Sequence, residues 1–103
     1  MTINFPWGSL LRGVLGHDAA ALAGVAALLA PGASAQVLLS VMPRDGVPPV
    51  RDDLAAVYAA HGLELVESRP ATANEIAASG SSWAKRLRAG TAARPVTCFR
   101  ARR

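Results

Sequence analysis

The sequence predicts a single domain of the α/β class, because apolar runs of strand length alternate with segments of helical periodicity along the chain. Its 103 residues allow one domain at most, and 51% of them are hydrophobic while 17% are charged. This share of apolar residues is large enough to build a core, so a disordered chain is excluded.

Strands and helices are predicted in alternation. Four runs have the composition or the alternating pattern of strands: residues 2–5, 36–42, 63–68 and 96–101. The run 36–42 is apolar throughout, which is typical of a strand covered on both faces. Helical spacing marks residues 8–15, residues 19–30, a face made of Val50, Leu54, Val57, Tyr58 and His61, and residues 73–79.

Local signals predict where two of these helices begin. Asp18 is a suitable N-cap for the helix over residues 19–30. Thr72, with Glu75 three residues later, has the spacing of a capping box, and Gly80 ends the helix that follows.

Residues 19–30 also resemble the apolar core of a signal peptide, with small residues at 33–35 as a cleavage site. A secretory signal has a basic segment before that core, whereas Arg12 is the only basic residue there and Asp18 follows it. Pro31 ends the run short of the roughly 20 residues of a membrane span. We therefore expect a core helix, in a cytoplasmic protein without a membrane segment.

Cysteine and histidine are scarce. One cysteine excludes a disulfide framework and a Cys-based zinc cluster, and the two histidines do not have the spacing of a metal-ligand motif. His17 and His61 stand at predicted helix ends, while Cys98 lies on an apolar strand and is expected in the core. The sequence therefore predicts no metal site.

Positive charge is concentrated in the last third of the chain. Residues 1–68 contain three arginines against six acidic residues, whereas residues 69–103 contain eight basic residues against one acidic residue. Clustered cations of this kind favour a polyanionic partner, and nucleic acid is the natural candidate. The alternative is a basic tail that only promotes solubility.

Two tryptophan motifs carry the chemical signal. Asn4-Phe5-Pro6-Trp7-Gly8 stands at the carboxyl end of the first predicted strand, where ligands bind in open α/β sheets. An aromatic plane beside a polar side chain and a proline suits a flat ring that bears an amine. The alternative is a strand that ends at Pro6, with Trp7 in the core.

The second motif is Ser81-Ser82-Trp83-Ala84-Lys85-Arg86-Leu87. A tryptophan beside cations supplies a stacking surface together with phosphate contacts. The alternative is a short helix capped by Ser82, with Trp83 and Leu87 buried and a solvated basic face.

Together, the stretches INFPWGSLLRGVLG (residues 3–16) and SSWAKRLRAG (residues 81–90) resemble the aminoglycoside-resistance 16S rRNA adenine-N1 methyltransferases over almost the whole chain. The resemblance implies a Rossmann-like class I fold that uses S-adenosylmethionine. It also implies that residues 1–103 are the C-terminal half of that sheet, its last four strands, with the final strand antiparallel.

The family flips an adenine out of the rRNA helix and holds it between two tryptophans. The resemblance implies that Trp7 and Trp83 form this clamp and that Phe5 and Pro6 line the same pocket. It places Asn4, Ser9 and Ser81 on the cofactor side, and it implies that 16S rRNA contacts Lys85, Arg86, Arg88, Arg94 and Arg100. Adenine N1 already has a lone pair, so methyl transfer needs alignment with the donor more than a base.

One departure limits what the chain is expected to do alone. No Gly-x-Gly-x-x-Gly turn with a following acidic residue occurs, so the cofactor-binding half is expected to be absent. We therefore expect the S-adenosylmethionine site to lie mostly outside this chain, and the chain by itself to transfer no methyl group. The alternatives are a non-enzymatic RNA-binding module and a truncated remnant.

Overall fold

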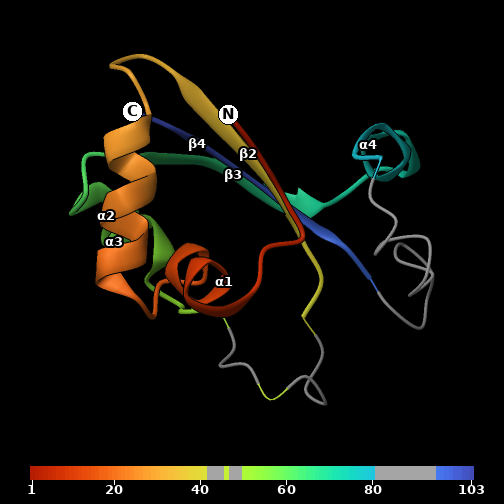
Figure 1. Ribbon diagram of the computed structural model, residues 1–103, viewed down its shortest axis with the longest axis horizontal. Helices are drawn as coiled ribbons and strands as arrows, with labels where there is room; N and C mark the ends of the chain where they lie inside the picture. Colours follow the sequence, from red (N-terminus) through yellow and green to blue (C-terminus); the bar gives the residue numbers. More distant parts are fainter. Residues whose placement is uncertain (42–45, 47–49, 81–94) are drawn as a thin grey trace.

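The computed structural model describes residues 1–41, 46, 50–80 and 95–103 (Figure 1). The elements of these residues are β1 (Thr2–Asn4), α1 (Gly8–Val14), α2 (Ala19–Leu28), β2 (Ser34–Leu39), α3 (Leu54–Ala59), β3 (Glu64–Pro70), α4 (Ala73–Ala78) and β4 (Thr97–Arg102). The predicted α/β class and the predicted order of elements are confirmed. The short helix predicted after Ser82 lies outside the described residues.

The strands form one mixed sheet in the order β1-β2-β4-β3. β1 lies parallel to β2, and β4 runs antiparallel to both β2 and β3. The prediction of an antiparallel final strand is therefore confirmed. β4 fills the gap between two strands that precede it in the sequence, and β1 takes one edge of the sheet.

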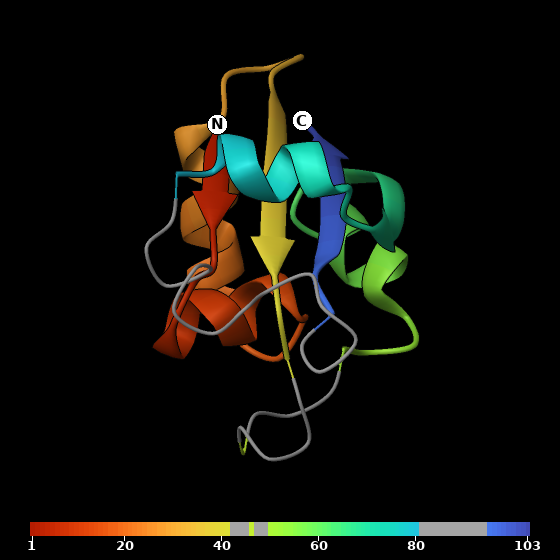
Figure 2. The same cartoon turned by 90° about the vertical axis from the view of Figure 1, so that its right-hand side faces the viewer.

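The sheet has helices on both faces, and they are unequally distributed. Helices α1, α2 and α3 lie on one face and α4 lies on the other (Figures 1 and 2). Val37 and Phe99 belong to the large core cluster, which includes residues of α1, α2 and α3, whereas Leu38 and Cys98 belong to a smaller cluster with Phe5. The predictions that the second strand is covered on both faces and that Cys98 is buried are thus confirmed.

Both predicted N-caps are present. The Asp18 carboxylate accepts a hydrogen bond from the Ala21 N–H at 3.0 Å. Thr72 and Glu75 form the reciprocal capping box, with distances of 3.1 Å and 2.8 Å. Each side chain satisfies backbone donors that the first helical turn leaves without an intrahelical partner.

Helix α3 begins later than predicted. The predicted apolar face started at Val50, whereas α3 begins at Leu54 and Val50 is 45% exposed. Arg51 accounts for the difference, because its N–H donates to the Leu15 carbonyl oxygen at 3.2 Å and its guanidinium pairs with Asp53 at 2.7 Å. These contacts tie the segment to the end of α1 instead of to a helical turn.

Helix α2 is a core helix, as predicted, and buries Leu22, Val25 and Ala26. Among the described residues no single helix is long and apolar enough to cross a membrane. Only α1 and α2 taken together reach that length and composition, and they are bent by 83° relative to each other.

The crossing of α1 and α2 depends on Gly13. An added Cβ atom there would lie 2.8 Å from the Ala21 Cβ and 3.1 Å from the Leu22 backbone nitrogen, so the helices would have to separate. We expect Gly13→Ala to lower the free energy of unfolding by about 1–3 kcal/mol, although alanine favours a helix. Urea unfolding followed by circular dichroism measures the change. Gly24→Ala is the matched control, because an added Cβ on α2 meets nothing there; equal stabilisation by both changes would contradict the prediction.

Candidate functional site

The first tryptophan motif leads from β1 into α1 through a strained residue. The Phe5 N–H donates to the Leu38 carbonyl oxygen at 2.7 Å, so pairing with β2 continues beyond Asn4. Phe5 itself has a φ of 52°, in the left-handed region, which costs a residue with a Cβ roughly 1–2 kcal/mol. Such strain persists only where the surrounding structure enforces it, and it is concentrated at functional sites. The conformation of Phe5 turns the backbone out of the strand toward Trp7.

The aromatic side chains of this motif lie in different environments. Phe5 is 6% exposed and packs with Leu38 and Cys98, whereas Trp7 is 66% exposed. The alternative that placed Trp7 in the core is therefore wrong, and Phe5 is the core aromatic residue. The remaining site residues predicted in this segment are exposed or half-buried: Asn4, Pro6 and Ser9.

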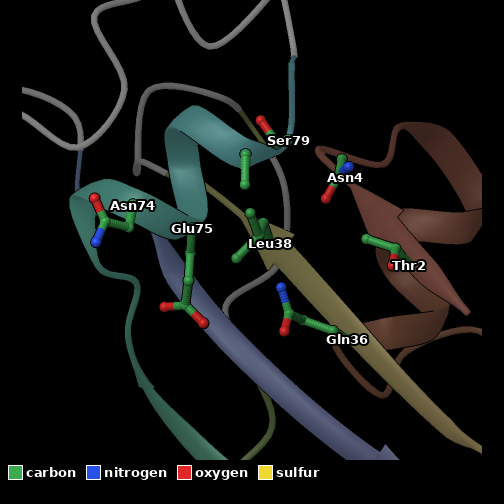
Figure 3. A pocket seen from close by; sticks show the side chains of 8 residues that line it. Thr2, Asn4, Gln36, Leu38, Asn74, Glu75 and Ser79 are labelled. Carbon is green, nitrogen blue, oxygen red and sulfur yellow. The ribbon is translucent and has the colours of Figure 1, made fainter.

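A cavity of about 400 Å³ lies between α4 and the sheet, beside β1 (Figure 3). Its lining includes Thr2 and Asn4 from β1, Gln36 and Leu38 from β2, and Asn74, Glu75 and Ser79 from α4 and its C-terminal end. Asn4 comes from β1 and Ser79 from the C-terminal end of α4 (Figure 3), where the Ser79 hydroxyl donates to the Ile76 carbonyl oxygen at 2.6 Å. Carboxamide and hydroxyl groups both donate and accept hydrogen bonds, so this lining suits a small polar ligand.

Glu75, on the α4 side of this cavity, is fixed by Arg69 of β3. The guanidinium donates to both carboxylate oxygens, at 2.7 Å and 2.8 Å. These hydrogen bonds, with one from the Thr72 N–H, lower the pKa of Glu75 from its usual 4.5 to about 2. A carboxylate held ionised in this way is a poor proton acceptor at neutral pH, so we assign it no acid–base role.

The lowered pKa of Glu75 predicts a pH dependence of stability. A folded-state pKa below the unfolded value stabilises the fold above about pH 4.5, and this contribution is lost as the pH falls toward about 2. We expect the stability difference between the native protein and Glu75→Gln to be largest above about pH 5 and to shrink as the pH falls toward about 2. Urea unfolding across this range measures it. A difference independent of pH would show that the carboxylate charge contributes nothing.

Arg100 is the predicted RNA-contacting residue that the structure describes. It is exposed on β4, and its guanidinium donates to the Gln36 side-chain oxygen at 3.2 Å. Because Gln36 also lines the cavity, Arg100 lies next to it. The other predicted residues are outside the described part of the chain: Ser81, Trp83, Lys85, Arg86, Arg88 and Arg94.

Sequence reasoning missed part of this site. Gln36 and Ser79 reach the cavity from a strand and a helix end that no motif marked. Glu75 was predicted only as a helix cap, and its pairing with Arg69 depends on how α4 folds back over the sheet. Within residues 1–41, 46, 50–80 and 95–103, no cluster of His, Cys, Asp and Glu suitable for a metal ion is formed.

Comparison with known proteins assigns the family. Residues 1–101 match the family model described as NpmA: 16S rRNA (adenine(1408)-N(1))-methyltransferase. A 16S rRNA (adenine(1408)-N(1))-methyltransferase from Streptoalloteichus hindustanus is 40% identical, over 82% of this chain and 45% of its own length. An rRNA methyltransferase from Saccharopolyspora hirsuta is 42% identical, over 80% of this chain and 60% of its own.

Solved structures agree with the sequence relatives. The 16S rRNA methyltransferase KamB superposes with a TM-score of 0.79 at 34% identity, over 98% of this chain and 53% of that chain. A second structure is a tryptophan-to-alanine mutant of a 16S rRNA (adenine(1408)-N(1))-methyltransferase from Catenulisporales acidiphilia, with the cosubstrate SAM. It superposes with a TM-score of 0.72 at 29% identity, over 98% of this chain and 51% of that chain.

The chain therefore spans about half the length of the relatives it matches. The match of the family model extends over nearly every residue of the chain, and both tryptophan motifs lie within it. By sequence and by fold, the chain belongs to the NpmA family of 16S rRNA (adenine(1408)-N(1))-methyltransferases.

Proposed function

We propose that this chain is the C-terminal half of an S-adenosylmethionine-dependent 16S rRNA adenine-N1 methyltransferase that confers aminoglycoside resistance. The observation that carries the proposal is the exposed Trp7 at the carboxyl end of β1, in a family whose members act on adenine 1408. An exposed indole offers a flat face on which a flipped adenine can stack.

In this proposal Trp7 and Trp83 hold the adenine ring between them, and Phe5 and Pro6 set the path of the chain into the clamp. Positive charge develops on the ring as N1 is methylated, and the indole faces stabilise that charge by cation–π attraction. Stacking recovers roughly 1–3 kcal/mol per face, comparable to the few kcal/mol that flipping costs. The cations that grip 16S rRNA are Lys85, Arg86, Arg88, Arg94 and Arg100.

The cofactor side of the site is proposed at Asn4, Ser9 and Ser81. The cavity beside Asn4 supports this, because its carboxamide and hydroxyl groups suit the amine, carboxylate and hydroxyl groups of S-adenosylmethionine. S-adenosylmethionine supplies the methyl group when bound. The residues of this chain orient the acceptor base and close one side of the donor site, while the segment that the relatives have in addition supplies the remainder.

A chimera tests the proposal. This chain replaces the segment that it matches in the Streptoalloteichus hindustanus relative, and transfer of a labelled methyl group to 30S subunits is measured. We expect methylation of adenine 1408 by the chimera and none by the 103-residue chain alone. Transfer by the chain alone would contradict the division into halves. A folded chimera that binds 30S subunits without methylating them would favour the non-enzymatic RNA-binding alternative.

A further inference from the structure

Helix α4 is a short element with little burial of its own. None of its six residues is buried, and its apolar attachment to the sheet is Ile76, which packs against the cluster of Phe5, Leu38 and Cys98. A helix of this length is unstable in isolation, because the free-energy cost of forming its first turn exceeds the gain from its few hydrogen bonds. Its position over the cavity therefore depends on polar contacts.

Arg69 supplies most of those contacts from β3. Its Nε donates to Glu67 at 2.7 Å, while Nη1 and Nη2 donate to the two oxygens of Glu75 at 2.7 Å and 2.8 Å. Nη1 also donates to the Pro70 carbonyl oxygen at 3.1 Å. The planar guanidinium thereby fixes both the distance and the angle between strand and helix, which a lysine cannot do.

Glu75 connects Arg69 to the start of the helix and to β4. One oxygen accepts from the Thr72 N–H at 2.8 Å, and the other lies 3.8 Å from the Cys98 Sγ on β4. The Glu75 side chain is 17% exposed and the Arg69 side chain 34%, so the pair is partly shielded from water. By comparison, the Arg102–Glu64 pair on the same sheet is 57% and 63% exposed.

We propose that Arg69 is a positioning residue, which holds α4 over the sheet and thereby sets the width of the cavity between β1, with Asn4, and the end of α4, with Ser79. This inference rests on the proposed function, in which Asn4 belongs to the donor side of the site. Arg69 lies outside the cavity lining, so its effect on the donor is indirect. Loss of the pair lets α4 move and widens the opening between Asn4 and Ser79.

Amide hydrogen exchange on the chain itself tests whether Arg69 holds α4. In Arg69→Met we expect the amides of Ile76, Ser79 and Gly80 to exchange about 10-fold faster, while the amides of α2 are unchanged. Arg69→Lys should give a smaller acceleration. Arg102→Met, which removes an exposed ion pair, is the matched control and should leave α4 unchanged. Equal acceleration in α2 and α4, or none in α4, would overturn the proposal.

Kinetics of the chimera test the consequence for the donor. We expect Arg69→Met to raise the KM for S-adenosylmethionine about 10-fold with kcat changed less than about 2-fold, and Arg69→Lys to recover part of the loss. If Arg69→Met accelerates exchange in α4 but leaves the KM for S-adenosylmethionine unchanged, the positioning role is overturned while the methyltransferase function stands. If the unsubstituted chimera transfers no methyl group, the proposed function has failed, and the exchange measurement alone decides whether Arg69 holds α4.

Discussion

We expect replacement of Trp7 with alanine to lower kcat/KM for methyl transfer by the chimera roughly 5- to 150-fold, the equivalent of about 1–3 kcal/mol of the proposed stacking on the adenine. Folding changes little, because Trp7 is 66% exposed and contributes little to the core. Trp7→Phe should retain much of the activity, since phenylalanine keeps an aromatic face. Initial rates on 30S subunits, together with urea unfolding of the same variants, measure both effects.

Leu28→Ala is the control for removal of an exposed apolar side chain. Leu28 is 75% exposed on α2, remote from the motif at the end of β1. We expect its replacement to alter neither activity nor stability. An unfolded Trp7→Ala would show that the tryptophan supports the fold, and a fully active one would show that the adenine is not held by this residue.

Leu22→Ala has the largest expected effect on stability. Leu22 is 1% exposed and belongs to the core cluster between α2 and the sheet. Truncation removes buried methyl groups and leaves a space that the helices fill only in part, so we expect a loss of about 2–5 kcal/mol in the free energy of unfolding. A small domain has about 5–15 kcal/mol in total, so the variant loses a large part of its stability.

Urea unfolding followed by circular dichroism measures that loss. The same Leu28→Ala variant serves as the control, since it makes an identical substitution six residues later in the same helix and is expected to change the free energy of unfolding by less than about 0.5 kcal/mol. Similar losses from the two variants would mean that α2 does not bury the face containing Leu22 in solution.

The parts of the fold that depend on neighbouring residues were predictable from the sequence. Asp18 caps α2, and Thr72 with Glu75 forms the capping box, because both signals are complete within four residues. The continuous apolar run 36–42 correctly indicated a strand covered on both faces, and Cys98 is buried as its apolar neighbours implied.

The parts that depend on distant residues were not predictable. The first turn of the predicted third helix is lost because Arg51 bonds to Leu15, far away in the sequence. Arg69 could be counted among the cations of the C-terminal third, but its two hydrogen bonds to Glu75 form only because α4 folds back over the sheet. Likewise the sequence left open whether Trp7 lies in the core, and only the fold shows that Trp7 is exposed while Phe5 is buried.

The position of β4 constrains how the chain is made. Because residues 97–102 pair with both β2 and β3, neither strand has that neighbour until these residues have left the ribosome. The growing chain therefore carries two strands with unpaired edges, a state that is prone to association. Pairing across such sequence distances also makes folding slow. A chain that ends before Thr97 leaves β2 and β3 without the strand that joins them.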